Sequence, residues 1–168
     1  MILNSPIIKK NYLDVGGCAS ANDFSLAFYG SVIISRFPCL FFEHEFKSNM
    51  GRTLIIAEPC VPFHLLIATS HFESLDSPRH RKDQMQATFN LLKKAQSDEF
   101  RNHSVLVGDF NFGTTWASEE NVIIKNGFKD VMHDFVDKTE WTMPKTKRFA
   151  AWRPDKVVTE VNPASENS

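Results

Sequence analysis

The segment Val105–Phe112 carries the residue types best suited to metal-assisted chemistry. Three apolar residues predict a short buried strand, and Gly108 lets the backbone turn sharply as that strand ends. Asp109 and Asn111 then stand at the carboxyl end of the strand, where open α/β sheets commonly bind their ligands. A carboxylate and an amide two residues apart suit a hard divalent ion, an activated water and a phosphoryl oxygen. The alternative interpretation is an ordinary turn, because Gly, Asp and Asn are all favoured in turns.

Two further polar clusters accompany predicted strands. His71 and Glu73 come after the run Phe63–Thr69, and Asp155 lies within a strand candidate at Trp152–Thr159. If the three strands are neighbours, one imidazole, two carboxylates and one amide converge on one cleft. Such a set can cleave a phosphodiester with a metal, which neutralises phosphate oxygens while a carboxylate or a His–Asp pair prepares water. Each residue also has a structural alternative, as a strand-end hydrogen-bond or salt-bridge partner.

Composition limits the class of protein. The chain has 168 residues, which predicts one domain with a real core, and its 42% hydrophobic content supports a globular fold. The formal net charge of −1 gives no whole-molecule attraction to nucleic acid, so any DNA contact must use local patches. Cys18, Cys39 and Cys60 match no zinc spacing, which favours free thiols in a reducing compartment. No signal peptide or bilayer-length apolar run is apparent, so we expect a soluble intracellular monomer without a membrane partner.

Apolar runs punctuated by turn residues predict strands in the first half of the chain and helices later. We expect strands at Phe28–Phe37, Cys39–Phe42, Thr53–Glu58, Phe63–Thr69 and Ser104–Gly108, with further candidates at Thr139–Thr142 and Trp152–Thr159. Residues 1–27 are rich in turn signals and show little periodicity. Strands that end in polar clusters, with helices between them, are typical of an α/β layered domain.

The clearest helix spans Pro78–Gln96. Ser77 and Pro78 form a good N-cap and first-turn pair, and apolar residues from Met85 to Ala95 recur at near-helical spacing. The basic run Arg79–Lys82 lies outside that stripe, and we expect it on the solvated surface. A second helix is expected at Ser118–Asn126, with Gly127 as its C′ residue.

The order of these clusters along the chain, and the residues within them, resemble those of a known family. Thr69-Ser-His-Phe-Glu-Ser74, Gly108-Asp-Phe-Asn111 and Arg153-Pro-Asp-Lys-Val-Val158 are similar to motifs of the endonuclease/exonuclease/phosphatase superfamily. Within it, Tyr29–Arg36 and Asn49–Arg52 resemble the 5′-tyrosyl-DNA phosphodiesterases (the tyrosyl-DNA phosphodiesterase 2 group). The resemblance implies an α/β fold in which a two-sheet sandwich is flanked by helices.

The resemblance also implies an activity. A protein of this kind would be a Mg²⁺-dependent phosphodiesterase, with Mn²⁺ as an alternative ion. It would act on DNA with a 5′-phosphotyrosyl or other 5′ adduct during repair, in the nucleus and also in the cytoplasm.

Site roles follow from the matched positions. His71 resembles the histidine that stabilises the scissile phosphate, and Asp109 resembles the acid that binds the metal or orients the nucleophilic water. Asn111 resembles the amide that positions water or phosphate, and Asp155 resembles the acid that holds the catalytic base histidine in its working tautomer. Arg52 and Trp141 resemble residues of the cleft, one for phosphate and one for packing on nucleic acid or peptide.

The chain also departs from the family pattern. Neither the family's metal-binding Glu, in a Gln-Glu motif, nor its terminal Ser-Asp-His has a counterpart, and Phe110 and Gly113 replace a common Thr and a basic residue. We therefore expect a partial domain at residues 1–158 and a polar tail at 159–168. Two alternatives stay open. One is another phosphodiesterase or phosphatase of this fold, acting on RNA, sphingomyelin or inositol phosphates. The other is a truncated binding module without catalysis.

Overall fold

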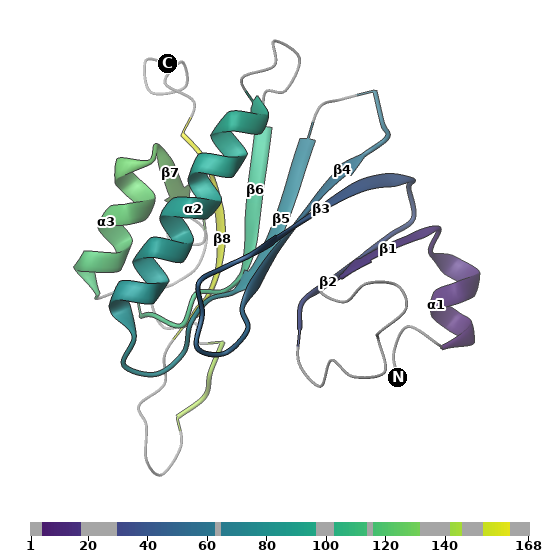
Figure 1. The fold of residues 1–168 in the computed structure, drawn as a ribbon. Coiled ribbons are helices and arrows are strands. Elements are labelled where there is room, and N and C mark those ends of the chain that lie inside the picture. The colour runs from purple at the N-terminus through teal and green to yellow at the C-terminus, as the bar shows by residue number, and fades with distance from the viewer. Residues whose placement is uncertain are drawn as a thin grey trace.

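The computed structural model describes residues 5–17, 30–62, 65–96, 103–113, 116–131, 142–145 and 153–161. After a short first helix, strands follow one another in the first half of the chain, and further helices lie between strands in the second half (Figure 1). In order, they are α1 (Pro6–Asn11), β1 (Asp14–Gly17), β2 (Val32–Ser35), β3 (Cys39–Glu45), β4 (Thr53–Pro59), β5 (Leu65–His71), α2 (Pro78–Gln96), β6 (His103–Asp109), α3 (Ala117–Lys125), β7 (Phe128–Asp130) and β8 (Asp155–Glu160).

Six of the strands form one mixed sheet, in the order β3-β4-β5-β6-β8-β7, and β1 pairs with β2 in a separate sheet. Within the larger sheet only β5 and β6 are parallel, and the other neighbours are antiparallel. A parallel pair needs a crossover connection, and α2 supplies it. The carboxyl ends of β5 and β6 therefore lie at the same edge of the sheet.

The core lies between this sheet and the two longer helices. Figure 1 shows α2 and α3 side by side over one face of the sheet. The apolar stripe of α2 is fully buried there at Met85, Phe89 and Leu92. Strand residues that point to the same face complete the core, namely Leu54, Ile56, Leu66, Ala68, Leu106 and Val158.

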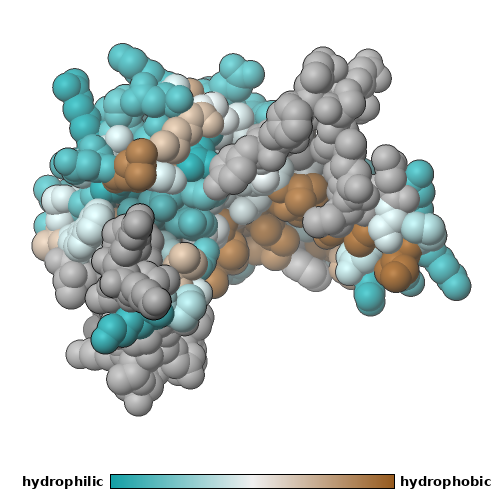
Figure 2. All heavy atoms as spheres, turned by 90° about the horizontal axis from the view of Figure 1, so that it is seen from below, coloured by the Kyte–Doolittle hydropathy of each residue, from teal (hydrophilic) through white to brown (hydrophobic). Residues whose placement is uncertain are grey.

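The opposite face of the sheet is covered in part by the β1–β2 pair. Ile55 and Ala57 alternate with core residues along β4, so they point away from the helices, and both are buried. The β1 and β2 strands both contact β4. Elsewhere apolar side chains reach the surface, and Figure 2 shows such surface gathered across the middle of the molecule seen from below.

These features confirm an α/β architecture with two sheets and flanking helices. The bounds of α2 match the expected helix, and each strand expected between Phe28 and Gly108 is present. Three short elements, α1, β1 and β7, were not anticipated. The candidate strand at Thr139–Thr142 lies largely outside the described residues. No helix in the described part of the chain is long and apolar enough to cross a membrane.

Two expectations need correction. Gly108 was expected to turn the chain at a strand end, but it lies inside β6, opposite both Ser70 and Lys156. The domain was expected to end at residue 158, but β8 continues through Glu160, and Val161 donates a backbone hydrogen bond to Gly127. Pairing with β7 holds these residues, because Phe128 lies opposite Glu160.

Candidate active site at the carboxyl ends of β5 and β6

Three polar residues lie side by side at one edge of the larger sheet. In the parallel pair of β5 and β6, His71 is in register with Asp109. In the antiparallel pair of β6 and β8, Asp109 is in register with Asp155. The topology therefore brings together residues that are up to 84 positions apart in the sequence (155 − 71).

Close contact between the two parallel strands depends on Gly108. Its φ angle is +157°, and a Cβ atom built there would lie 2.0 Å from the backbone oxygen of Ser70. Only glycine can occupy such a position without moving one of the strands. Because His71 and Asp109 are the next residues of their strands, this close approach sets the distance between their side chains.

His71 and Asp109 form a half-buried pair. The distance from His71 Nε2 to Asp109 Oδ2 is 3.5 Å. Burial lowers the pKa of His71, and the Arg52 charge lowers it further, while Asp109 and Asp155 act in the opposite direction. The net direction is downward, so the imidazole is mostly neutral at neutral pH and can accept a proton.

A tight turn holds Asn111 beside this pair. The backbone N–H of Asn111 donates to Asp109 Oδ1 at 2.9 Å, and Asn111 has a positive φ of 53°, which asparagine tolerates. The rings of Phe110 and Phe112 are fully buried and anchor the turn in the core. Asp109-Phe-Asn111 is therefore a turn, as in the structural alternative, and it also aims two polar side chains at one place.

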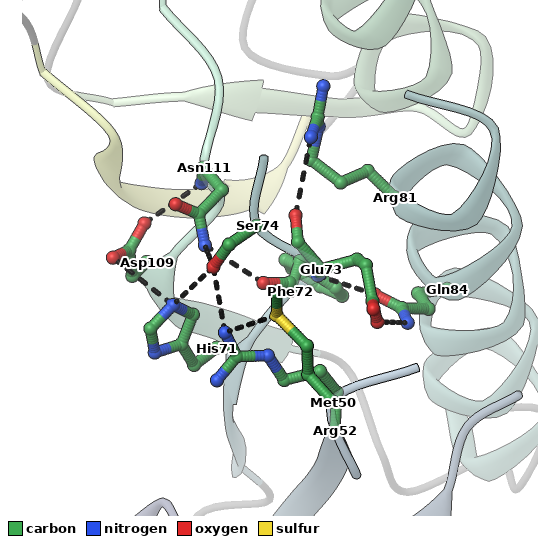
Figure 3. A network of polar contacts seen from close by, with 10 residues as sticks. All are labelled: Met50, Arg52, His71, Phe72, Glu73, Ser74, Arg81, Gln84, Asp109 and Asn111. Atoms are coloured by element: carbon green, nitrogen blue, oxygen red, sulfur yellow. Dashed lines mark hydrogen bonds and ion pairs between the residues drawn. The ribbon is translucent and has the colours of Figure 1, made fainter. Parts of the chain in front are cut away.

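Ser74 lies at the centre of the polar cluster (Figure 3). Its Oγ accepts hydrogen bonds from Arg52 Nη2 at 2.7 Å and from Asn111 Nδ2 at 3.0 Å. It also lies 3.4 Å from His71 Nε2. Sequence reasoning did not select Ser74, although its place at the end of the Thr69–Ser74 motif was a signal.

Glu73 is a structural residue in this site. Its buried carboxylate accepts hydrogen bonds from Ser48 Oγ at 2.5 Å, the Asn49 backbone at 3.1 Å and Gln84 Nε2 at 3.1 Å. Burial opposes its ionisation, but these hydrogen bonds outweigh burial and lower its pKa. These contacts join the residues after β5 to the Ser48–Asn49 turn and to α2, so they favour a structural role for Glu73 over the positioning of His71.

The other residues singled out from the sequence differ in how buried they are and in how near they lie to Ser74. Arg52 is buried behind Ser74, with only 6% of its surface exposed, and also donates to Met50 Sδ at 3.4 Å. Asp155 is exposed and acts on His71 through its charge. Trp141 lies outside the described residues. The basic run Arg79–Lys82 was expected on the surface, but this was wrong for Arg81, which is 1% exposed and contacts Glu119 and the loop after β5.

Comparison with solved structures identifies the fold. Residues of this chain superpose on truncated TDP2 from Caenorhabditis elegans with a TM-score of 0.70 and 16% identity, covering 93% of this chain and 64% of that one. TDP2 from D. rerio complexed with single strand DNA product gives 0.64 and 17%, covering 95% and 67%. An endonuclease/exonuclease/phosphatase family protein from Bacteroides thetaiotaomicron gives 0.59 and 15%, covering 78% and 54%. This chain has the endonuclease/exonuclease/phosphatase fold.

These likenesses concern three-dimensional structure. By sequence, no family model and no curated protein matches the chain. The chain spans 64% of the length of the truncated C. elegans TDP2 chain and 50% of that of the C. elegans TDP2 chain.

In this endonuclease/exonuclease/phosphatase fold, Asp109 is suited to be one ligand of a divalent ion. The described residues contain no group of three His, Cys, Asp or Glu side chains that could hold a metal. Mg²⁺, however, usually keeps several waters and binds one or two carboxylates together with substrate phosphates. The Asp109 side chain is 31% exposed and meets the carboxylate requirement.

Proposed function

We propose that this protein hydrolyses phosphate esters and that its substrate is a DNA end carrying a 5′-phosphotyrosyl adduct. The observation that carries the proposal is the cluster around Ser74, in which His71, Arg52 and Asn111 all lie within 3.4 Å of one hydroxyl oxygen. His71 also pairs with Asp109. An imidazole, a carboxylate and two donors that meet at a sheet edge are suited to phosphoryl chemistry.

Under this proposal, each polar residue of the site has a role that follows from its chemistry. Neutral His71 accepts a proton from water or, once protonated, hydrogen-bonds a phosphate oxygen or gives a proton to the leaving oxygen. Asp109 stabilises the protonated imidazole, because an opposite charge 3.5 Å away favours it. Asn111 and Ser74 fix polar groups beside the pair, so little reorganisation is needed when charge develops on the phosphate.

A magnesium ion, or Mn²⁺ in its place, would be held by Asp109 together with substrate oxygens. When bound, such an ion neutralises charge on the phosphate and lowers the pKa of a coordinated water.

DNA is the favoured substrate class within the fold. Support comes from the similar D. rerio TDP2, which was solved in complex with single strand DNA product. It also comes from the Thr69–Ser74 motif, which resembles that of the 5′-tyrosyl-DNA phosphodiesterases. Under this proposal the protein acts as a monomer on damaged DNA in the nucleus and also in the cytoplasm.

The test is cleavage of a 5′-phosphotyrosyl oligonucleotide by the full chain with Mg²⁺, with Mn²⁺ and with chelator. RNA, sphingomyelin and inositol phosphates serve as competing substrates. We expect release of tyrosine only with the metal. Asp109→Asn and His71→Gln should each lower the rate by about 100-fold or more.

His103→Gln is the matched control, because His103 is exposed at the far end of β6. It should leave the rate unchanged. Turnover of another substrate with no tyrosyl release would refute the proposed DNA substrate but support the proposed phosphate-ester hydrolysis. A folded chain that turns over none of these substrates would refute the enzymatic proposal and support a binding module.

A further inference from the structure

Arg81 is a buried cation that the proposed chemistry does not use. It lies on α2, is 1% exposed and pairs with Glu119 of α3, with 3.0 Å between Arg81 Nη2 and Glu119 Oε1. Its Nε has no hydrogen-bond partner in the described part of the chain. Burial of a charge is costly unless its contacts compensate, so the contacts of Arg81 are decisive for its place in the fold.

Arg81 also lies over the ring of Trp116, with 5.3 Å between its Cζ and the ring centroid. Its other side-chain hydrogen bonds reach the loop that follows β5. Its Nη1 donates to the backbone oxygen of Leu75 at 2.8 Å and to that of Glu73 at 3.3 Å. These two carbonyl groups belong to the residues on either side of Ser74. The guanidinium group therefore holds the backbone both before and after the serine at the centre of the site.

A second side chain of α2 completes this clamp. Gln84, three residues after Arg81 and on the same face of the helix, accepts a hydrogen bond from the Glu73 backbone N–H at 2.8 Å. The held loop is strained, because Leu75 has a positive φ of 63° although it is not glycine. Such a conformation persists only where the surroundings impose it.

We infer that Arg81 is a positioning residue that acts through Ser74. By fixing the backbone at residues 73 and 75, it sets the Ser74 hydroxyl between Arg52, Asn111 and His71. Its effect on catalysis rests on the function proposed above, while its effect on the geometry of the site does not. Through Glu119 the clamp also ties α3 to the site.

The informative substitution is Arg81→Lys. Lysine keeps the positive charge for Glu119, but a single ammonium group lacks the fork that reaches Glu119 and two carbonyls together. Phe89→Leu is the matched control, because Phe89 is buried on α2 two turns further on, where its truncation weakens the core without a contact to the loop.

A double-mutant cycle tests whether Arg81 acts through Ser74. We expect Arg81→Lys to lower kcat by about tenfold or more, with a smaller change in KM, because a small displacement of a positioned group is costly. In a Ser74→Ala background the same substitution should cause no further loss. Equal losses in both backgrounds would overturn the inference, as would an equal loss of kcat in Phe89→Leu.

A second readout does not need activity. The ring signals of His71, assigned with His71→Gln, are recorded by NMR at one fixed pH. Both Arg81→Lys and Ser74→Ala should move them, and Phe89→Leu should not. If Arg81→Lys does not fold, Glu119→Gln loosens the same guanidinium and should move the signals in the same way.

Unmoved His71 signals in a folded Arg81→Lys or Glu119→Gln protein would overturn the inference, even if the enzyme is active. If the His71 signals move in these variants but the parent protein has no turnover, the proposed function is refuted and the positioning role of Arg81 is supported.

Discussion

At the scale of single residues, position 108 requires glycine. Gly108→Ala places a methyl group 2.0 Å from the Ser70 oxygen, so β5 and β6 must separate just before His71 and Asp109. We expect the free energy of unfolding to fall by about 3 kcal/mol or more, from backbone strain and lost strand pairing. Chemical denaturation followed by circular dichroism measures the loss.

Gly51→Ala is the control for this prediction. Gly51 also has a positive φ, of 65°, but nothing lies within 4 Å of a Cβ built on it. Its substitution should cost about 1 kcal/mol from backbone strain alone. Equal costs at the two glycines would show that close strand contact is not what Gly108 provides.

Glu73 makes stability depend on pH. Its folded-state pKa is lowered from the ordinary value of 4.5, so the folded state binds the proton less readily than the unfolded state does. Its contribution is complete above pH 4.5 and is lost as the pH falls through the folded pKa. We expect Glu73→Gln to flatten the acid limb of a plot of unfolding free energy against pH.

Asp76 provides the comparison, because it is an exposed acid three residues away. Asp76→Asn should leave the acid limb as in the parent protein. Each unit of difference between the folded and unfolded pKa of Glu73 corresponds to about 1.4 kcal/mol of unfolding free energy. If Glu73→Gln and the parent lose stability equally between pH 5 and the acid end point, Glu73 is not the source of the acid sensitivity.

The sequence predicted some of these residues better than others. Asp109, Asn111 and His71 could be selected because they lie in polar clusters that follow apolar runs, and strand ends are where polar side chains gather. Ser74 and Arg81 could not, because their importance comes from contacts between a loop and a helix. A basic residue beside others on a helix usually faces water, and Arg81 is buried because both α3 and the loop after β5 pack against it.

At the scale of elements, length decides what the sequence can predict. The 19 residues of α2 contain several turns of apolar periodicity, and its bounds were predicted without error. β7 has only three residues and α1 only six, too few for a periodic signal. The position of β8 between β6 and β7 was not predictable either, because it depends on pairing across a long connection.

A buried ionic cluster joins β7 to β8. Asp130 Oδ2 lies 2.8 Å from Arg153 Nη2 and 3.6 Å from Lys156 Nζ, and all three residues are buried. Asp130→Asn would leave both cations without this counter-charge. We expect it to destabilise the protein by about 3–5 kcal/mol, measured by denaturant unfolding.

Lys156→Met tests the same cluster from the other side. Burial lowers the pKa of Lys156, although Asp130 and Glu120 raise it. Its Nζ lies 4.5 Å from the centroid of the Phe112 ring, in surroundings that suit a thioether. Because Asp130 keeps Arg153, this substitution should change stability by less than about 1 kcal/mol. A loss as large as that of Asp130→Asn would show that the lysine is as necessary to the cluster as the aspartate.

At the scale of the whole molecule, β3 lies at one end of the larger sheet. Among the described strands β3 pairs only with β4, and its Leu40 and Phe42 side chains are 56% and 53% exposed. They point to the same face as the core residues of β4, but α2 does not extend over them. An exposed apolar edge strand offers both unpaired backbone groups and apolar surface to another chain.

We therefore expect Phe42→Lys to reduce aggregation of the monomer at high protein concentration without loss of the fold. A lysine on an edge strand opposes pairing with a second edge, and the exposed site tolerates it within about 0.5 kcal/mol. Light scattering against protein concentration measures the effect. Ile124→Lys is the control, because Ile124 is 60% exposed but lies on α3, whose backbone groups are already paired. Equal improvement in both variants would assign the association to apolar surface in general, and the edge of β3 would then have no special part in it.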